Sequence, residues 1–215
     1  MAKKLMSVPL LLLVAVLAAE VYYGWSPEAD RPTWFMENLP VFLVIPVLLR
    51  FHPKLKLTTL TLAVLALHAL VLMVGGYYTY AKVPIGHWFQ EALDLKRNHY
   101  DRLGHFMQGF GPALALRELL IKRSVLTRGW FLSIIVFCMC LAFSSFYEMI
   151  EWWTALIMGQ GAHEFLGTQG DIWDTQWDMF MCLVGASTAL IGFAKLQDSQ
   201  IRRSGFKLPV KKSVA

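Results

Sequence analysis

Six long apolar stretches constrain this chain more than any other feature of its sequence. They cover approximately residues 5–25, 34–49, 57–78, 99–120, 130–158 and 172–196. Several approach the roughly 20 residues that an α-helix needs to cross a bilayer. Hydrophobic residues make up 56% of the 215-residue chain and charged residues only 16%, whereas about a quarter of a soluble domain is charged. The sequence therefore predicts an all-α, polytopic transmembrane helical bundle with about six spans.

The spans leave no room for a separate soluble domain. We expect a single transmembrane helical domain over residues 1–198 and a basic cytoplasmic tail over residues 199–215. The pair Ala18-Ala19 resembles a signal-peptide cleavage site. However, the aromatic residues that follow it, ending at Trp25, fit an interfacial belt. The first stretch is therefore interpreted as a retained helix.

The distribution of charge predicts the orientation in the membrane. Cytoplasmic loops of membrane proteins carry an excess of Lys and Arg. With the N-terminus inside, 15 of the 20 Lys and Arg residues fall in inner segments and 13 of the 15 acids fall toward the outer half. Both termini are therefore predicted to be cytoplasmic. The basic tail is expected to lie on anionic lipid, which attracts each basic residue by about 1 kcal/mol, so the net charge of +5 indicates the lipid bilayer as a partner and no nucleic acid.

The fourth stretch is the least apolar and carries two ionisable residues on one helix face. Asp101 and His105 are four residues apart, and Gln108 continues the same stripe. A carboxylate and an imidazole at this spacing can chelate a metal, or the carboxylate can fix the imidazole tautomer for proton transfer. The alternative is a helix start at which Asp101 favours the positive end of the helix dipole. His105 lies a full turn deeper, which leaves both interpretations open.

Two carboxylates lie together in the fifth stretch. Glu148 and Glu151 are three residues apart and share a helix face. Two carboxylates this close do not both ionise without a cation or a hydrogen-bond donor nearby. The alternative is a helix end that emerges into water among interfacial tryptophans. Because the apolar run continues to Met158, we expect both glutamates to remain within the bundle.

Three aspartates begin the sixth stretch. Asp171, Asp174 and Asp178 share one helical face at positions i, i+3 and i+7. Asp171 suits an N-cap and Asp174 suits the first turn, but neither role explains Asp178, which lies a turn further into an apolar helix. The glycine-rich loop at 159–170 is placed to fold over a site formed by these residues.

The predicted topology places all these acids at the periplasmic face. The candidate catalytic residues are Asp101, His105, Glu148 and Glu151, and the candidate metal ligands are Asp101, His105, Glu148, Glu151, Asp171, Asp174 and Asp178. An oxygen-rich set with one imidazole favours a divalent metal ion such as Mg²⁺, Mn²⁺ or Ca²⁺, and Zn²⁺ also fits. The alternative is that Arg97 or Arg102 neutralises part of the set. Glu20 and Glu37, near the outer ends of the first two stretches, are left open as further members of the site, and His68 is expected to be a hydrogen-bonded core histidine.

Four stretches carry a resemblance to a known family. They are Leu72-Met-Val-Gly-Gly-Tyr-Tyr-Thr-Tyr-Ala81, Asn98-His-Tyr-Asp-Arg-Leu-Gly-His-Phe106, Phe146-Tyr-Glu-Met-Ile-Glu-Trp-Trp153, and Gly167-Thr-Gln-Gly-Asp171 through Asp178-Met179. At these stretches the chain is similar to the YjdF-like inner-membrane family of bacteria, over most of its length. The resemblance implies a multi-pass protein of the bacterial inner membrane and implies no activity.

A weaker similarity is to VanZ-like membrane proteins. Their pattern pairs an Asp and a His in one helix with a Glu in the next and Asp residues beyond. Asp101, His105, Glu148 or Glu151, and Asp171 or Asp178 fit that order, and Arg102 stands where VanZ-like proteins often carry Lys. VanZ-like members are linked with glycopeptide resistance, a link that we do not extend to this chain.

Three functions fit these patterns. The first is a metal-dependent intramembrane enzyme that faces the periplasm and acts on a lipid or lipid-linked substrate. The second is an ion- or proton-coupled transporter, ranked lower because the inner halves of the third, fifth and sixth stretches are nearly uniformly apolar. The third is a structural membrane protein whose polar cluster only fixes helix packing. Nucleotide-binding loops, nucleophile elbows and His-Glu-x-x-His zinc motifs do not occur in the sequence.

Overall fold

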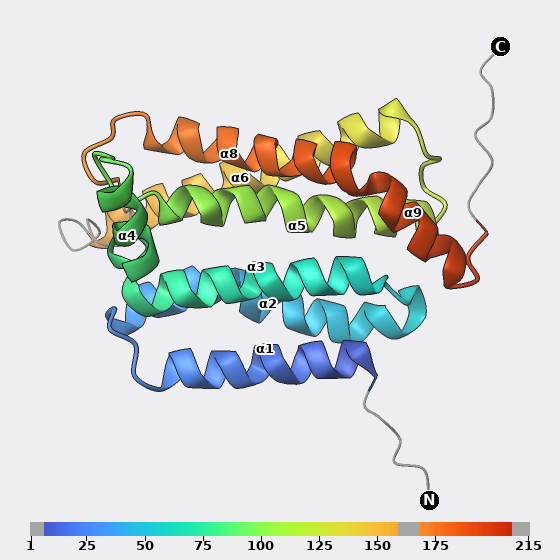
Figure 1. Ribbon diagram of the computed structural model, residues 1–215, viewed down its shortest axis with the longest axis horizontal. Coiled ribbons are helices and arrows are strands. Elements are labelled where there is room, and N and C mark those ends of the chain that lie inside the picture. The colour runs from blue at the N-terminus through green and yellow to red at the C-terminus, as the bar shows by residue number, and fades with distance from the viewer. Residues whose placement is uncertain (1–6, 159–167, 208–215) are drawn as a thin grey trace, which may run out of the picture.

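The described part of the chain is a bundle of long helices whose axes run roughly parallel (Figure 1). The computed structural model describes residues 7–158 and 168–207. The long helices are α1 (Val8–Trp25), α2 (Arg31–Leu55), α3 (Thr59–Tyr78), α5 (Tyr100–Lys122), α6 (Trp130–Met158) and α8 (Asp174–Thr188), the last continued by the π-helical turn η3 (Ala189–Phe193) and by α9 (Ala194–Arg203). A 3₁₀ turn, η1 (Tyr80–Lys82), and the short helix α4 (Pro84–Ala92) connect α3 to α5.

Five helical segments of the described chain are long and apolar enough to cross a membrane. They are α1, α2, α3, α6 and the continuous segment from α8 to α9. The sixth long helix, α5, lies among α3, α6 and α8 at the centre of the bundle (Figure 1). Because the surrounding helices shield α5 from lipid, it can carry polar residues and glycines that an outer helix does not tolerate. The prediction of an all-α polytopic bundle is confirmed.

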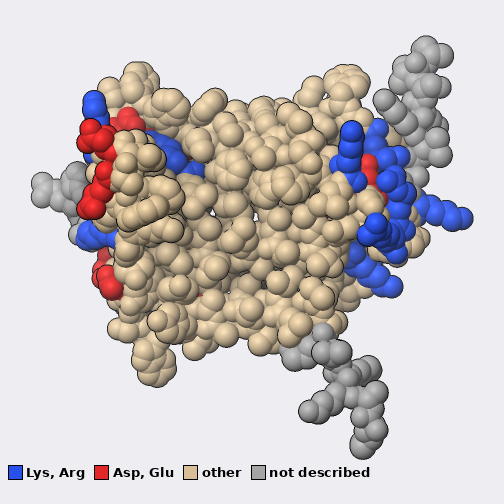
Figure 2. Space-filling model, viewed as in Figure 1, with Lys and Arg blue, Asp and Glu red and all other residues tan. Residues whose placement is uncertain are grey.

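The two ends of the bundle differ in charge. On the face shown in Figure 2, an uncharged band covers the middle of the molecule, Lys and Arg gather at the end where α9 lies, and the acids at the other end stand among a few basic residues. The start of α1 and the end of α9 both lie at the basic end (Figure 1). By the positive-inside rule this end is cytoplasmic, so the acidic end is periplasmic.

The second helix is longer than its sequence predicted. The expected stretch was 34–49, but α2 runs from Arg31 to Leu55, with one proline in its first turn and three more inside the helix. Asp30 caps its N-terminus by accepting hydrogen bonds from the Thr33 backbone N–H at 3.0 Å and from the Thr33 hydroxyl at 2.6 Å. Lys56 ends the helix in a left-handed conformation with φ of 49°. The predicted stretch was too short because it followed the apolar run, whereas the helix continues at both ends through polar residues such as Arg31, Arg50 and Lys54.

Removal of the α2 cap provides a first test of this fold. Burial alone would raise the pKa of Asp30, but the hydrogen bonds from Thr33 outweigh burial and the pKa lies below its usual value. The cap therefore stabilises the fold at neutral pH, and its contribution is lost as pH falls through the lowered pKa. Asp30→Ala is expected to cost about 1 kcal/mol of unfolding free energy at pH 7. Thermal unfolding in detergent should show that this difference shrinks at acid pH, and an equal loss at both pH values would contradict the prediction.

Small residues bring α5, α6 and α8 into close contact. A methyl group on Gly109 of α5 would overlap the Cys182 backbone carbonyl of α8, and one on Gly185 of α8 would overlap the Phe106 carbonyl of α5. The Cys140 thiol of α6 lies 3.7 Å from the Gly109 carbonyl oxygen. Small residues at helix contacts allow this approach in membranes. The three helices are thereby locked at one level, and this level determines which residues meet nearer the periplasm.

Substitution of the glycine at this contact should separate α5 from α8. Gly109→Ala is expected to lower the unfolding free energy by about 1–3 kcal/mol, because the added methyl group meets rigid backbone. The matched control is Gly192→Ala, since a Cβ at Gly192 meets no described atom within 4 Å. Thermal unfolding of both variants in the same detergent is the measurement. An equally stable Gly109→Ala protein would show that the helices are not in backbone contact.

A buried polar network closes the cytoplasmic end. Glu118 of α5 is fully buried and accepts hydrogen bonds from the Thr58 backbone N–H and hydroxyl at 2.8 Å, from the Thr61 hydroxyl at 2.6 Å, and from Lys122 at 2.7 Å. Gln197 of the last span donates to the Thr61 hydroxyl at 3.0 Å. The few polar residues in the inner halves of the third and sixth spans therefore meet Glu118 of the fourth span. Isolated threonines and a glutamine in apolar stretches gave no sign that they would converge on Glu118.

Candidate functional site

The acidic centre is formed by five of the predicted residues at the periplasmic ends of α5, α6 and α8. These residues are Asp101, His105, Glu148, Glu151 and Asp178. Gly109, Cys140 and Cys182 set the common level of the three helices. Residues four and eight positions nearer the periplasm then lie one and two turns above that level. The small-residue contact thus explains why side chains from three separate spans meet.

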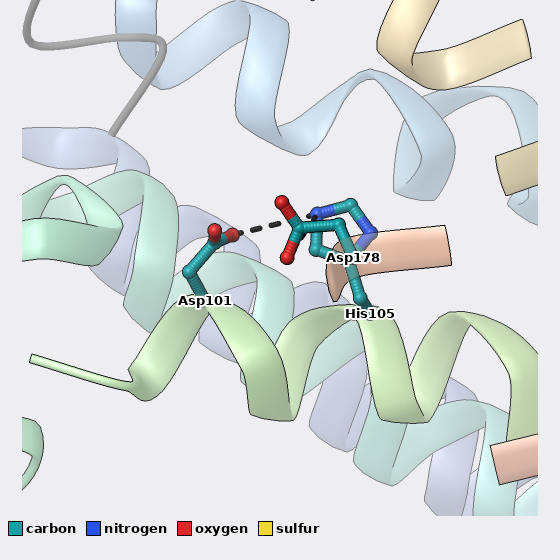
Figure 3. Close-up of side chains that lie close together, drawn as sticks. All are labelled: Asp101, His105 and Asp178. Carbon is teal, nitrogen blue, oxygen red and sulfur yellow. Dashed lines mark ion pairs between the residues drawn. The ribbon is translucent and has the colours of Figure 1, made fainter. Parts of the chain in front are cut away.

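The His105 imidazole lies at the middle of the acidic centre. Its Nε2 atom is 3.5 Å from an Asp101 oxygen, 3.8 Å from a Glu148 oxygen and 3.8 Å from an Asp178 oxygen. Figure 3 shows the Asp101 and His105 side chains on the same side of α5, close to Asp178 from α8. His105 is 6% exposed and Asp178 is 2% exposed. The centre is therefore largely removed from solvent, and the half-buried Asp101 and Glu151 are its more accessible members.

Gln108 determines which nitrogen of His105 faces the acids. The Gln108 side-chain oxygen lies 3.0 Å from His105 Nδ1. An amide oxygen only accepts hydrogen bonds, so Nδ1 carries the hydrogen, and in the neutral ring Nε2 presents its lone pair. That lone pair points toward carboxylates on three sides. Such an arrangement is repulsive unless a cation, either a metal ion or a proton, lies between them.

The spacing of the polar atoms suits a metal ion. Ligand atoms from Asp101, His105 and Asp178 lie within 4.8 Å of one another, and so do those from His105, Glu148 and Glu151. Two ligands on a tetrahedral ion at about 2.1 Å from the metal are about 3.4 Å apart. The distances of 3.5–3.8 Å from His105 Nε2 are close to this value and exceed those of ordinary N–H···O hydrogen bonds.

One carboxylate oxygen in the acidic centre is buried without a partner. Glu148 is 8% exposed, and its Oε1 atom has no hydrogen-bond partner among the described residues. This is the oxygen that lies 3.8 Å from His105 Nε2. Because a buried polar atom is costly to leave unpaired, this oxygen is available to a cation or a hydrogen-bond donor beside His105.

Two arginines form ion pairs with the remaining aspartates, Asp171 and Asp174. Arg102 contacts Asp171 at 3.2 Å and Asp174 at 2.7 Å, and it also pairs with Asp178. Arg97 contacts Asp174 at 2.5 Å and Asp171 at 3.6 Å. Asp171 and Asp174 therefore lie beside the acidic centre in an arginine–aspartate layer, and Asp178 belongs to both groups. Neutralisation by the arginines, one of the two alternatives left open by the sequence, applies to this layer.

The start of α8 differs from its prediction. Asp174 lies in the first helical turn as expected, but Trp173 occupies the N-cap position that Asp171 was predicted to hold. Asp171 instead accepts a hydrogen bond from the Trp173 backbone N–H at 2.9 Å. Most of the glycine-rich loop predicted to fold over the site, residues 159–167, lies outside the described residues. Gln169, which follows it, exchanges two hydrogen bonds of 2.9 Å with the Asn98 backbone.

Two further side chains, Glu37 and Tyr147, lie beside the acidic centre. Glu37 of α2 is 5% exposed and interacts electrostatically with Asp101 and His105. The Tyr147 ring meets the His105 ring edge to face at a centroid distance of 6.5 Å. The position of Glu37 at the outer end of its stretch had left it open as a member of the site, whereas nothing in the sequence singled out Tyr147.

The prediction for His68 was wrong in one respect. The residue is buried at the middle of α3 as expected, with 9% exposure. Its Nε2 atom, however, has no hydrogen-bond partner among the described residues. His68 lies between the acidic centre and the cytoplasmic network around Glu118.

The fold and the acidic centre define a polytopic membrane protein with a buried ionisable site at its periplasmic end. Residues 8–199 match the model of a family described as predicted membrane protein, DUF2238, and the chain belongs to this family. It is 51% identical over 185 residues to inner membrane protein YjdF of Escherichia coli K12, which covers 86% of this chain and 88% of that protein. No solved structure matches the chain. The match confirms the resemblance seen in the sequence and the inner-membrane location.

Proposed function

We propose that the acidic centre binds a divalent metal ion and that the protein is a metal-dependent enzyme of the inner membrane acting on a lipid or lipid-linked substrate at the periplasmic side. The observation that carries the proposal is the unpartnered, buried Glu148 oxygen that faces the His105 lone pair. A metal ion would satisfy both atoms and offset the surplus of carboxylates. A bound divalent ion polarises a phosphoryl or carbonyl oxygen and activates water.

The proposed histidine ligand also has a hydrogen-bond partner outside the ligand set, as metal-binding histidines usually do. A metal-bound histidine usually donates its second ring N–H to an oxygen that fixes its orientation. The contact between His105 Nδ1 and Gln108 supplies this partner. Carboxylates with a single imidazole suit Mn²⁺, Mg²⁺ or Zn²⁺.

The position of the acidic centre supports a lipid-linked substrate. The centre lies at the periplasmic end of helices whose outer surfaces are apolar (Figure 2). Asp101, one of its two half-buried members, lies in the first turn of α5, near the level where lipid headgroups meet the hydrocarbon. A polar headgroup can reach this level while its acyl chains stay in the bilayer.

Metal content of the purified protein is the first test. The detergent-purified protein is expected to hold a stoichiometric divalent ion in elemental mass spectrometry, and Asp101→Ala and Asp178→Ala are expected to lose it. Turnover is then tested in nanodiscs made with a bacterial lipid extract, by following metal-dependent products with mass spectrometry and comparing wild type with Glu148→Gln. A metal-free wild type after purification in metal-supplemented buffer would refute the metal site. A metal-bound protein without metal-dependent products would refute the enzymatic part.

Proton-coupled transport is the second candidate, and His68 is the observation that favours it. A proton on His105 would also satisfy the surrounding carboxylates, and the unpartnered His68 Nε2 lies between the acidic centre and the cytoplasmic network. The network itself argues against a path, because Glu118 and Gln197 are both hydrogen-bonded to Thr61 and each has further hydrogen-bond partners in the described chain. Proton flux into proteoliposomes that is lost in His68→Phe would place transport first.

A further inference from the structure

The helix α4 crosses the periplasmic end of the bundle with an apolar edge exposed. It stands roughly perpendicular to the long helices at that end (Figure 1). Ile85, Trp88 and Phe89 share one face at positions i, i+3 and i+4 and are 55%, 62% and 47% exposed. Leu93, directly after the helix, is 63% exposed. The opposite edge carries the polar residues His87 and Glu91.

The position of α4 is fixed by contacts with the start of α5. The Asn98 side chain donates a hydrogen bond to the Val83 carbonyl at 3.0 Å. Gly86 packs so closely against this side chain that a Cβ at position 86 would overlap it. Val83 is 1% exposed and Asn98 is fully buried. The packing of Asn98 against Val83 and Gly86 therefore fixes α4 with its apolar edge facing outward.

The exposed edge lies at the level of an aromatic belt. Trp25 at the end of α1 is 81% exposed, Trp152 near the end of α6 is 56% exposed, and Trp173 before α8 is 59% exposed. These ends all lie at the periplasmic side of the bundle (Figure 1). Exposed tryptophans gather where lipid headgroups meet the hydrocarbon. Trp88, which is also exposed, extends this belt. The belt therefore favours lipid as the partner of the apolar edge of α4.

We propose that α4 is an interfacial helix that lays Ile85, Trp88 and Phe89 into the periplasmic leaflet and holds the rim of the acidic centre at headgroup level. A short helix with one apolar and one polar edge binds the membrane surface in this way. The link to the rim is Asn98, which contacts Val83 on one side and Gln169 on the other and follows Arg97 of the arginine–aspartate layer. Only the relevance of this position to a lipid-linked substrate rests on the proposed function.

Site-directed spin labelling tests the lipid contact without metal or turnover. Single cysteines are introduced at Ile85 and Trp88, with Glu91→Cys and His87→Cys as matched controls on the polar edge. The background is Cys138→Ser, because Cys138 is exposed whereas Cys140 and Cys182 are fully buried. The labelled proteins are reconstituted in vesicles of phosphatidylethanolamine and phosphatidylglycerol. Nitroxide accessibility to oxygen, which concentrates in lipid, is compared with accessibility to a water-soluble nickel chelate.

The proposal predicts opposite results for the two edges. Labels at positions 85 and 88 should be reached by oxygen at least severalfold more readily than by the nickel chelate, and labels at 87 and 91 should show the reverse. Equal exposure of both edges to the nickel chelate would place α4 in water and overturn the proposal. Labels at 85 and 88 that neither reagent reaches would show that protein covers the edge, and this would also overturn it. Neither result would bear on the metal content of the acidic centre, so the two proposals fail separately.

Discussion

His105→Ala is expected to lower the affinity for a divalent metal ion at least about 100-fold, because loss of outer partners alone costs 10–100-fold in metal sites. His105 Nε2 is the atom common to both sets of ligand atoms in the acidic centre. Its removal leaves carboxylates from three helices without a shared centre. Isothermal titration of the metal-depleted protein with Mn²⁺ and with Zn²⁺ is the measurement.

Two further variants make this result specific. Gln108→Leu keeps every proposed ligand but removes the partner of His105 Nδ1, so its affinity should fall by the smaller factor of about 10–100. His87→Ala removes an exposed histidine on α4 and should leave the affinity unchanged. If His105→Ala bound metal as tightly as the wild type, any metal would lie elsewhere and the assignment of the acidic centre would be wrong.

Arg102→Ala is expected to cost about 3–5 kcal/mol of unfolding free energy, because it strands buried carboxylates without their counter-charge. The Arg102 side chain is 10% exposed and pairs with Asp171, Asp174 and Asp178. The matched control is Arg123→Ala, which removes an exposed arginine at the cytoplasmic end of α5. Equilibrium unfolding in mixed micelles measures both.

Two further variants test whether the lost positive charge causes the instability. Arg102→Lys keeps the positive charge but loses the planar fork, so its stability should lie between those of wild type and Arg102→Ala. Arg102→Leu combined with Asp178→Leu removes both partners and should recover part of the loss. If Arg102→Ala lost less than about 1 kcal/mol, the typical value for an exposed pair, the arginine–aspartate layer would be a surface feature.

The fold could be predicted because the membrane restricts the possible structures. Within hydrocarbon every backbone group must be paired internally, so long apolar stretches become helices. The charge count then determined the orientation. The extent of α2 was the failure, since the helix runs past the apolar stretch into polar residues at both ends, from Arg31 to Leu55. An apolar run shows which residues face lipid but not how far the helix continues beyond them.

The acidic centre could be predicted in outline but not in its pairings. The spacing of Asp101 and His105 placed both on one face, and the topology placed Glu148 and Asp178 at the same end. Which aspartates would meet Arg97 and Arg102 depends on the rotation of α8 about its axis. That rotation is set by the contact between Gly109 and Cys182, and sequence periodicity does not reveal which small residues meet across helices.

The claim that a metal ion binds at His105 is tested most directly by anomalous X-ray diffraction from crystals of the Mn²⁺-loaded protein. We predict a single strong anomalous peak within about 2.3 Å of His105 Nε2, with oxygens of Asp101, Asp178 or Glu148 at similar distances. A peak that disappears in His105→Ala crystals would complete the assignment. A map with no peak in the acidic centre, although Mn²⁺ is present in excess, would contradict the account and leave a proton as the cation that His105 holds.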